Sequence, residues 1–355
     1  MNPEPIFSKK IKNIQALRGV AVLLIVFFHM ATIEKKYGGT HTLLPDFLQF
    51  GMFGVDLFFV ISGFVMVTVT RKKFQQPRQA FTFLYHRVSR IYPLYWFYSL
   101  LVLAIFLFQP SLVNSSQGNQ VNILASFLLL PQQQLPLLMV GWTLVHEIYF
   151  YLVFFIFLFL PEKRLIAALG LWITVILLFQ FQITSAAPPA LRLISHPLTL
   201  EFIGGCLLAV LTAGKKSSLA AGFSLLAALL ILTAAILCFV LQWQTTGLIE
   251  PPGWWRIVIM GVPALLIVYC LVQAEQQHLV LPGPLCRIGD ISYSIYLSHV
   301  LILNFIGRIW AGFATDATVD NWLILPIMLL AVIAVGFVSY IRVERPMIAI
   351  SRKIA

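Results

Sequence analysis

Five ionisable residues lie inside long apolar stretches of this 355-residue sequence, where a charge is costly and therefore points to function. They are His29, Asp56, Glu147, Glu201 and His299. The imidazole of His29 is suited to accept a proton from a hydroxyl group, because imidazole titrates near neutrality. His29 therefore predicts general-base chemistry on a hydroxylated substrate. The alternative is a hydrogen bond that bridges two helices.

Arg18 precedes His29 by 11 residues. In an α-helix this spacing makes three turns plus about 20°, so the two side chains share one face and lie about 16 Å apart. We expect Arg18 at the cytoplasmic membrane surface and His29 roughly half to two-thirds of the way across. Arg18 can then bind an anionic group, or it can anchor the helix by snorkelling.

Glu147 is the second catalytic candidate. Tyr151 follows it at i+4 on the same helical face, and Trp142 precedes it near the start of the span. A carboxylate inside a membrane needs a partner, and a histidine such as His29 from another span is the partner that also makes chemistry. The alternatives are a structural ion pair and a protonated glutamic acid. His146 points to a different side of the helix, and we therefore favour Glu147.

Asp56 begins the second apolar span. It can act in catalysis, or it can accept backbone N–H bonds at the helix start. Arg87 and Arg90, three residues apart, share a helical face and can bind phosphate oxygens together, although cytoplasmic arginines are expected there in any case.

A polar stripe at spacings of four and three residues runs along the ninth span. Its members are Ser292, Tyr296 and His299. Such a stripe suits either a ligand or hydrogen bonds between helices.

The composition defines the elements that must position these residues. The sequence is 60% hydrophobic and only 10% charged, with a mean hydropathy of +0.91, whereas soluble domains are about 25% charged. This excludes a cytosolic enzyme, a disordered protein and a nucleic-acid-binding module. The four cysteines form no CxxC pair, so neither a zinc site nor a disulfide framework is indicated. We expect an all-α polytopic transmembrane helical bundle.

Apolar runs bounded by charge, Pro or Gly indicate about ten membrane spans. They cover residues 14–33, 51–70, 91–109, 143–160, 164–182, 196–213, 218–241, 255–273, 288–309 and 321–341. With a cytoplasmic N-terminus, 19 of the 24 lysines and arginines lie on the cytoplasmic side and five outside. The positive-inside rule therefore places both termini in the cytoplasm. We expect residues 1–355 to form a single membrane-embedded domain with no additional soluble domain.

The predicted outer loop 109–141 contains no charged residue and is rich in Gln, Asn, Ser and Pro. Neutral hydrogen-bonding side chains suit a neutral hydroxylated ligand such as a sugar. The alternative is an ordinary solvated loop.

The ordered motifs resemble those of the acyltransferase 3 family of integral membrane O-acyltransferases over nearly the whole chain. The matching segments are residues 17–21 followed by His29, 54–64 with Asp56 and Ser62, 87–93 with Arg87 and Arg90, 141–144 followed by Glu147 and Tyr151, 289–299, and 344–346. The form Gly141-Trp142-Thr143-Leu144 is similar to that of the polysaccharide and exopolysaccharide O-acetyltransferase type.

This resemblance implies transfer of an acyl group, commonly acetyl, from cytoplasmic acyl-CoA to a hydroxyl of an extracytoplasmic glycan or lipid-linked glycan. The activated thioester requires no metal and no permanently bound cofactor. The site residues expected from the resemblance and the spacing are His29, Glu147 and Asp56 for catalysis, Arg18, Arg87 and Arg90 for acyl-CoA, and Trp142, Tyr151, Ser62, Ser292, Tyr296 and His299 for binding or supporting the acceptor. We expect a multi-pass protein of a bacterial plasma membrane, with no nucleic-acid partner.

Two other functions compete with this one. Intramembrane His and Glu residues can also relay protons in a proton-coupled transporter or flippase of a sugar-containing substrate, but the sequence shows neither repeated halves nor paired Pro/Gly-broken helices. A receptor or structural protein leaves the pattern of His29, Glu147 and the arginines unexplained.

Overall fold

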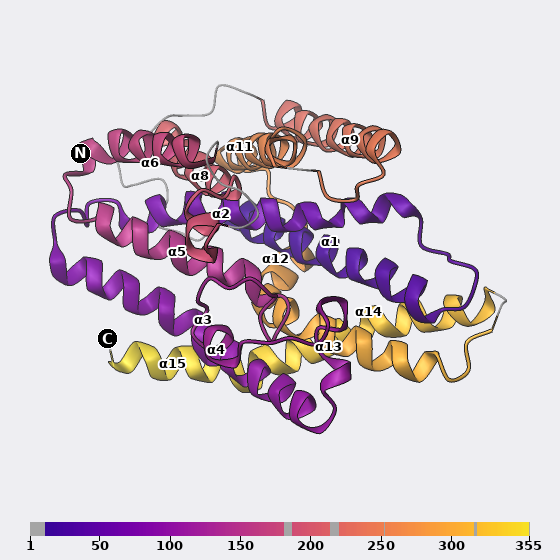
Figure 1. The fold of residues 1–355 in the computed structure, drawn as a ribbon. Helices are drawn as coiled ribbons and strands as arrows, with labels where there is room; N and C mark the ends of the chain where they lie inside the picture. The colour runs from indigo at the N-terminus through magenta and orange to yellow at the C-terminus, as the bar shows by residue number, and fades with distance from the viewer. Residues whose placement is uncertain (1–10, 181–186, 214–219, 252, 316–317, 355) are drawn as a thin grey trace. The chain divides into compact units, whose positions relative to one another are not determined.

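The computed structural model describes residues 11–180, 187–213, 220–251, 253–315 and 318–354. Every regular element in these ranges is helical (Figure 1). The chain divides into two compact units. The first unit comprises Met1–Thr68 and Leu200–Phe337, and the second comprises Val69–Thr199 and Val338–Ala355.

The first unit contains most of the long helices. Its elements are α1 (Lys12–Tyr37), η1 (Asp46–Met52), α2 (Phe53–Thr70), α8 (Leu198–Thr212), α9 (Ala221–Thr246), α10 (Trp254–Arg256), η5 (Ile257–Gly261), α11 (Val262–Gln276), α12 (Gly283–Asp290), α13 (Ser292–Trp310) and α14 (Val319–Ser339). Helix α1 packs along α12 and α13, and α9 runs beside α11 (Figure 1).

Glycines allow the helices of the first unit to approach closely. A Cβ atom on Gly19 of α1 would lie 2.3 Å from the carbonyl oxygen of Leu285 in α12, and one on Gly289 would lie 1.8 Å from that of Gln15. Both distances are far below van der Waals contact, so only glycine fits at either position. Small residues serve the same purpose in membrane bundles generally. Gly19 and Gly289, which both belong to the sequence motifs, therefore allow α1 to pack closely against α12.

The second unit is built on α3 (Pro77–Phe108) and α5 (Gly141–Phe157), which pack together. Its other elements are η2 (Pro110–Leu112), η3 (Ser115–Gln117), α4 (Ile123–Phe127), η4 (Glu162–Arg164), α6 (Leu165–Gln180), α7 (Pro189–Ile194), η6 (Tyr340–Glu344) and α15 (Arg345–Ile354).

Aromatic side chains of α3 hold the charge-free loop in place. Tyr92 and Tyr95 donate hydroxyl hydrogen bonds to the carbonyl oxygens of Leu128 (2.9 Å) and Ser126 (2.7 Å), and Trp96 donates its indole N–H to Phe127 (2.9 Å). The backbone of the segment around α4 is therefore hydrogen-bonded to side chains of α3.

The all-α membrane class is confirmed, and a helix lies within each predicted span in the described ranges, while the number of spans and the side of the termini stay predictions. Seven helices of the described ranges are long and apolar enough to cross a membrane, and α5 is a shorter apolar helix. Helix α3 begins at Pro77, before the predicted start of the third membrane span at residue 91. Proline is favoured at the first helical position, and a helix continues past the apolar region wherever its backbone geometry allows.

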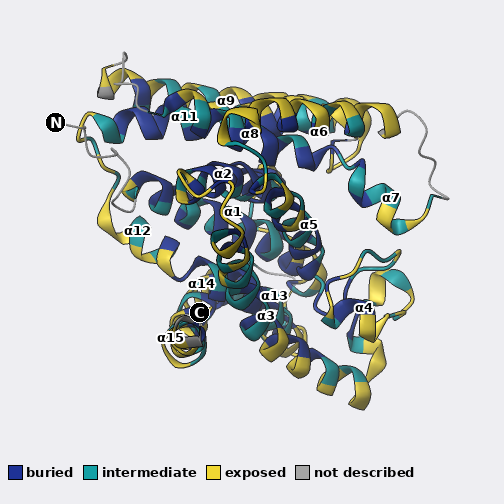
Figure 2. Ribbon diagram, turned by 90° about the vertical axis from the view of Figure 1, so that its left-hand side faces the viewer, coloured by how far each residue is buried: buried dark blue, intermediate teal, exposed yellow. Residues whose placement is uncertain are grey.

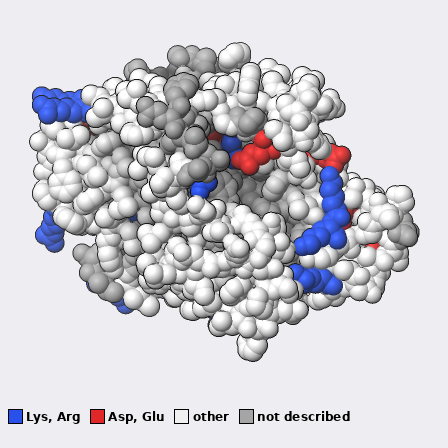
Figure 3. Space-filling model, in the orientation of Figure 1, with Lys and Arg blue, Asp and Glu red and all other residues white. Residues whose placement is uncertain are grey.

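Exposed apolar side chains provide a surface suited to lipid. Leu226, Leu229, Leu230 and Leu237 of α9 are each more than half exposed, and the outer side of α9 is largely exposed in Figure 2. Side chains without charge also cover most of the face shown in Figure 3. Soluble proteins rarely expose apolar patches of this extent, whereas a helix in a bilayer must.

A buried ionic cluster joins α2 to α10. Both oxygens of the fully buried Asp56 accept bonds from Arg256, at 3.0 Å from Nε and 3.1 Å from Nη2. Glu250 accepts a further bond from the Nη1 of Arg256, and the buried carboxyl of Glu201 lies against Asp56. We had expected Asp56 to bind backbone N–H groups if its role were structural. Its partner is instead a guanidinium 200 residues away.

This cluster predicts a strong effect on stability. Arg256→Gln should markedly destabilise the protein, by about 3–5 kcal/mol, because it leaves the Asp56 carboxylate buried without a cation. The double variant Asp56→Asn/Arg256→Gln should be more stable than Arg256→Gln alone. Thermal unfolding of purified protein in detergent, followed by size-exclusion chromatography, measures both.

The exposed pair between Lys35 and Asp46 provides the control, because its side chains are 43% and 61% exposed. Lys35→Gln should change stability by no more than about 1 kcal/mol. Equal melting temperatures for Arg256→Gln and Lys35→Gln would contradict a stabilising role for the buried cluster.

Candidate functional site

His29 and His299 form the centre of the candidate site in the first unit. His29 lies 17 residues into α1, and His299 lies on α13 and is fully buried. The Nε2 atom of His299 is 3.3 Å from the Nδ1 atom of His29, and the ring centroids are 4.9 Å apart. The packing of α1 on α13 therefore brings together two of the residues predicted from sequence.

The hydrogen-bond partners assign the tautomers of both rings. His299 Nδ1 lies 2.7 Å from the carbonyl oxygen of Tyr296, and His29 Nδ1 lies 2.9 Å from that of Ile25. A carbonyl oxygen only accepts, so both Nδ1 atoms carry hydrogen. In neutral rings both Nε2 atoms are then acceptors, and His299 Nε2 accepts from the shared Nδ1–H of His29. His29 thus presents a basic Nε2 atom, and its side chain is only partly buried.

Arg18 lies on the same side of α1 and contacts the polar stripe of α13. Its Nε and Nη2 atoms lie 3.4 and 3.3 Å from Ser292 Oγ, and its guanidinium lies 5.9 Å from the ring centroid of Phe58. Ser292, Tyr296 and His299 are all buried. The stripe therefore connects Arg18 to the histidine pair, as the 11-residue spacing predicts.

Glu147 and Tyr151 contact each other in the second unit, as their i+4 spacing predicts. The Tyr151 hydroxyl donates to Glu147 Oε1. Arg87 lies 5.5 Å from the ring centroid of Phe83 and 5.8 Å from that of Tyr151, and interacts electrostatically with Glu147 and with Arg90. The sequence offered Arg87 only as a phosphate ligand and missed its place beside Glu147. The partnership of Glu147 with His29 joins residues of different units and stays a prediction.

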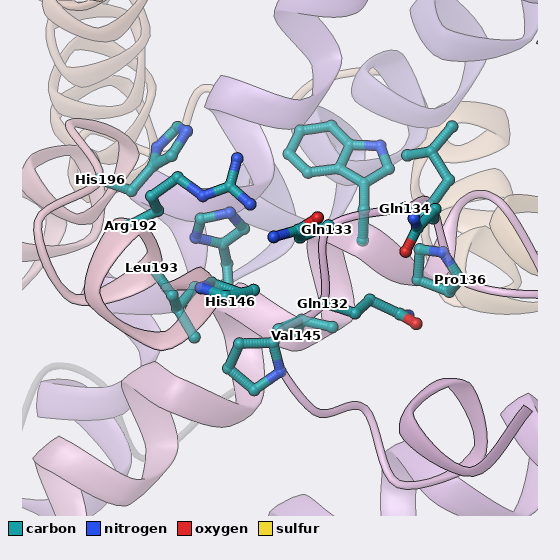
Figure 4. Close-up of a pocket in the computed structure, with 13 residues that line it drawn as sticks. Gln132, Gln133, Gln134, Pro136, Val145, His146, Arg192, Leu193 and His196 are labelled. Atoms are coloured by element: carbon teal, nitrogen blue, oxygen red, sulfur yellow. The ribbon is translucent and has the colours of Figure 1, made fainter. Parts of the chain in front are cut away.

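A pocket of about 330 Å³ lies on another face of α5 in the second unit (Figure 4). Trp142 and His146, one turn apart on α5, line it. The ring centroids of His146 and His196 are 4.7 Å apart. Residues 131–136, Pro189, Arg192 and Leu193 complete most of the wall. Trp142 was predicted as an acceptor ligand, and His146 was correctly placed on a different face from Glu147.

Sequence reasoning missed the contribution of Arg192 and His196 to this pocket. Their only signal is that Pro188-Pro189 and His196-Pro197 bracket a short helix between two spans. Arg192 lies in the loop that follows the predicted span 164–182, and His196 lies at the start of the next predicted span.

The remaining candidates lie on α2. Asp56 belongs to the ionic cluster with Arg256, and Ser62 lies six residues further along the helix, next to Gly63. A Cβ on Gly63 would lie 1.9 Å from the carbonyl oxygen of Phe202 in α8, so this motif glycine also serves close packing. Within the described ranges, no group of three or more His, Cys, Asp and Glu residues is arranged to hold a metal.

Comparison with known proteins gives a consistent family. The model of the Acyl_transf_3 family, described as an acyltransferase domain, matches residues 11–341. The chain is 29% identical over 315 residues to the exopolysaccharide production protein ExoZ of Rhizobium meliloti (strain 1021), covering 84% of this chain and 90% of ExoZ. It is 26% identical over 334 residues to the acyltransferase MdmB of Streptomyces mycarofaciens, covering 85% of this chain and 81% of MdmB.

No solved structure matches the chain. The family model spans all the motifs from Arg18 to His299. It includes both the histidine pair and the Glu147 cluster. The chain belongs to the acyltransferase 3 family and is a membrane-embedded O-acyltransferase.

Proposed function

We propose that this enzyme transfers an acetyl group from cytoplasmic acetyl-CoA to a hydroxyl of an extracytoplasmic polysaccharide, with His29 as the general base. The observation that carries the proposal is the hydrogen bonding of His29. Its Nδ1–H donates to the carbonyl oxygen of Ile25 and to Nε2 of His299. The other ring nitrogen, Nε2, is therefore the acceptor in the neutral ring. The similarity to ExoZ, a protein named for exopolysaccharide production, supports a polysaccharide acceptor, and the setting is a bacterial plasma membrane.

The proposed step is a single acyl transfer. His29 Nε2 removes the proton from the acceptor hydroxyl as its oxygen attacks the thioester carbonyl. The C–S bond breaks, and the CoA sulfur takes the proton from the imidazolium. The ester and free CoA result, so atoms and charge balance. A base of this kind typically contributes about 10²–10⁴-fold.

His299 is the positioning residue for His29 in this mechanism. Its Nε2 accepts from the Nδ1–H of His29, while its own Nδ1–H is held by the carbonyl oxygen of Tyr296. Glu147 is proposed to take part in the same reaction, either as the partner of the His29 imidazolium or by contact with the sugar.

The arginines are proposed to bind the phosphates of the acyl-CoA. Arg18, Arg87 and Arg90 all lie on segments that the positive-inside rule places toward the cytoplasm. Guanidinium groups are well suited to phosphate oxygens, and the repulsive interaction of Arg87 with Arg90 supports the binding of an anion near them.

Loss of His29 should abolish transfer. His29→Ala should lower turnover by at least about 10²-fold, the usual cost of losing a general base, with normal expression and folding. Release of CoA from acetyl-CoA in the presence of polysaccharide measures it. His41→Ala, an exposed histidine, is the matched control. A folded His29→Ala enzyme that keeps more than about a tenth of wild-type turnover would contradict the role of His29 as the general base.

Loss of His299 should act only through His29. His299→Leu should lower kcat by about 10–100-fold, the cost of a hydrogen bond to a group that becomes charged, and leave the KM for acetyl-CoA unchanged. His299→Gln, whose carbonyl oxygen can accept, should retain more activity. In a His29→Ala background the His299→Leu change should have no further effect. Independent, multiplying losses would instead assign His299 a purely structural role.

Neutralising the arginines should weaken donor binding. Arg18→Gln, Arg87→Gln and Arg90→Gln should each raise the Kd for acetyl-CoA by about tenfold or more, because charge-assisted hydrogen bonds contribute about 1.5–3 kcal/mol. The effect should shrink with a dephospho-CoA donor. Calorimetry measures the affinities, and Arg78→Gln, exposed on the same helix as Arg87, is the control. Unchanged affinity in all three variants would disprove the assignment.

A further inference from the structure

The pocket beside Trp142 and His146 is large enough to hold a small ligand. Its volume of about 330 Å³ is at the lower end of the range of about 300–1,000 Å³ found for small-molecule pockets. Figure 4 shows Arg192 and His196 on one side and Gln133, Gln134 and Pro136 opposite. All of its lining residues belong to the second unit.

Several polar atoms at this pocket are buried without a partner. The side-chain oxygen and nitrogen of Gln132 and the Nε atom of Arg192 have no hydrogen-bond partner within the described part of the chain. More than about 90% of buried polar groups in proteins are satisfied. The open amide of Gln132 and the open Nε of Arg192 suit a ligand that supplies both acceptors and a donor.

The charge of the lining limits the chemistry of that ligand. Arg192 is the single Lys, Arg, Asp or Glu among the 13 residues that line the pocket. A guanidinium without a neighbouring carboxylate favours an anion, and its planar donors match a carboxylate. Phosphate sites commonly gather several cations, whereas Arg192 is the single Lys or Arg among the lining residues.

The other lining residues favour a sugar ring. Gln132 and its neighbours offer amide groups to hydroxyls, and Trp142 and His146 offer aromatic rings to an apolar ring face. The charge-free loop alone favoured a neutral sugar. Arg192, contributed by α7 from a different loop, adds the positive charge that this loop lacks.

We propose that this pocket binds an acidic sugar residue of the acceptor polysaccharide, with Arg192 at its carboxylate and Gln132 at its hydroxyls. The proposal rests on the polysaccharide function proposed above and names its substrate class. Because α5 carries both Trp142 and Glu147, a glycan bound in this pocket contacts the same helix that presents the Glu147–Tyr151 pair.

Binding is tested on the full-length protein in nanodiscs without any acyl donor. The probes are a disaccharide of glucuronic acid and glucose and its carboxyl-reduced neutral counterpart, titrated by calorimetry. The acidic disaccharide should bind at least about tenfold more tightly to the wild type, the difference expected for one charge-assisted contact. Arg192→Gln should remove that difference, and Arg192→Lys should keep part of it. Gln132→Ala should weaken both probes.

Arg308→Gln is the matched control, because Arg308 lies on the predicted outer side at the end of α13 and outside the pocket. It should change neither affinity. Equal binding of both probes to the wild type, or no binding of either, overturns the proposal. Inorganic phosphate that displaces the acidic probe at equal concentration also overturns it, since the pocket would then be a general anion site.

A separate assay of CoA release distinguishes this proposal from the proposed function. If the acidic probe binds as expected but acetyl-CoA and polysaccharide release no CoA, the proposed function fails and the saccharide site stands. If transfer proceeds and Arg192→Gln leaves the KM for an acidic polysaccharide unchanged, the saccharide site fails alone.

Discussion

The hydrogen bond between His29 and His299 depends on how closely α1 packs against its neighbours. Gly19 and Gly289 bring the backbones of α1 and α12 into contact, and α13 begins two residues after α12 ends. The packing of α1 against α12 therefore also determines the distance between α1 and α13. A side chain at either glycine would push α1 away and separate the rings, which now have nitrogen atoms 3.3 Å apart. The family's glycine motifs and its histidine motif thus serve one geometric requirement.

The same apolar surroundings explain why Asp56 and Glu34 of the first unit have polar partners. Asp56 and Arg256 are both at least about nine-tenths buried, and each bonds the other. Glu34, also fully buried, accepts bonds from the backbone N–H groups of Leu43 and Leu44 and from Asn321. In an apolar medium, the free energy cost of an ion without polar partners exceeds the conformational entropy lost when those partners are ordered around it. Such contacts hold helix ends and loops in place around the histidine pair.

The sequence predicted the elements well and the contacts between them only in part. Hydropathy predicted the all-α membrane class because apolar length is a local property, and helical spacing correctly predicted Glu147 with Tyr151 and the stripe from Ser292 to His299. The pairing of Asp56 with Arg256, 200 residues apart, and the meeting of Trp142 with Arg192 at one pocket depend on tertiary packing. A single sequence carries no periodic signal for such contacts, and the positive-inside rule restricts them only by assigning loops to sides.

Helix α5 presents polar side chains to two different surroundings. Successive residues on a helix are rotated by about 100°, so His146 and Glu147 face different surroundings although they are neighbours in sequence. One face of α5 lines the pocket with Trp142 and His146, and the next presents Glu147 to Tyr151 and Arg87. A rigid helix transmits the position of a bound sugar directly to the carboxylate, because the two faces cannot move independently. If a polysaccharide binds at the first face, the position of the bound sugar within the polysaccharide determines which of its hydroxyls can approach Glu147 at the second face. This arrangement would confer positional selectivity on the acceptor without a contact to every sugar.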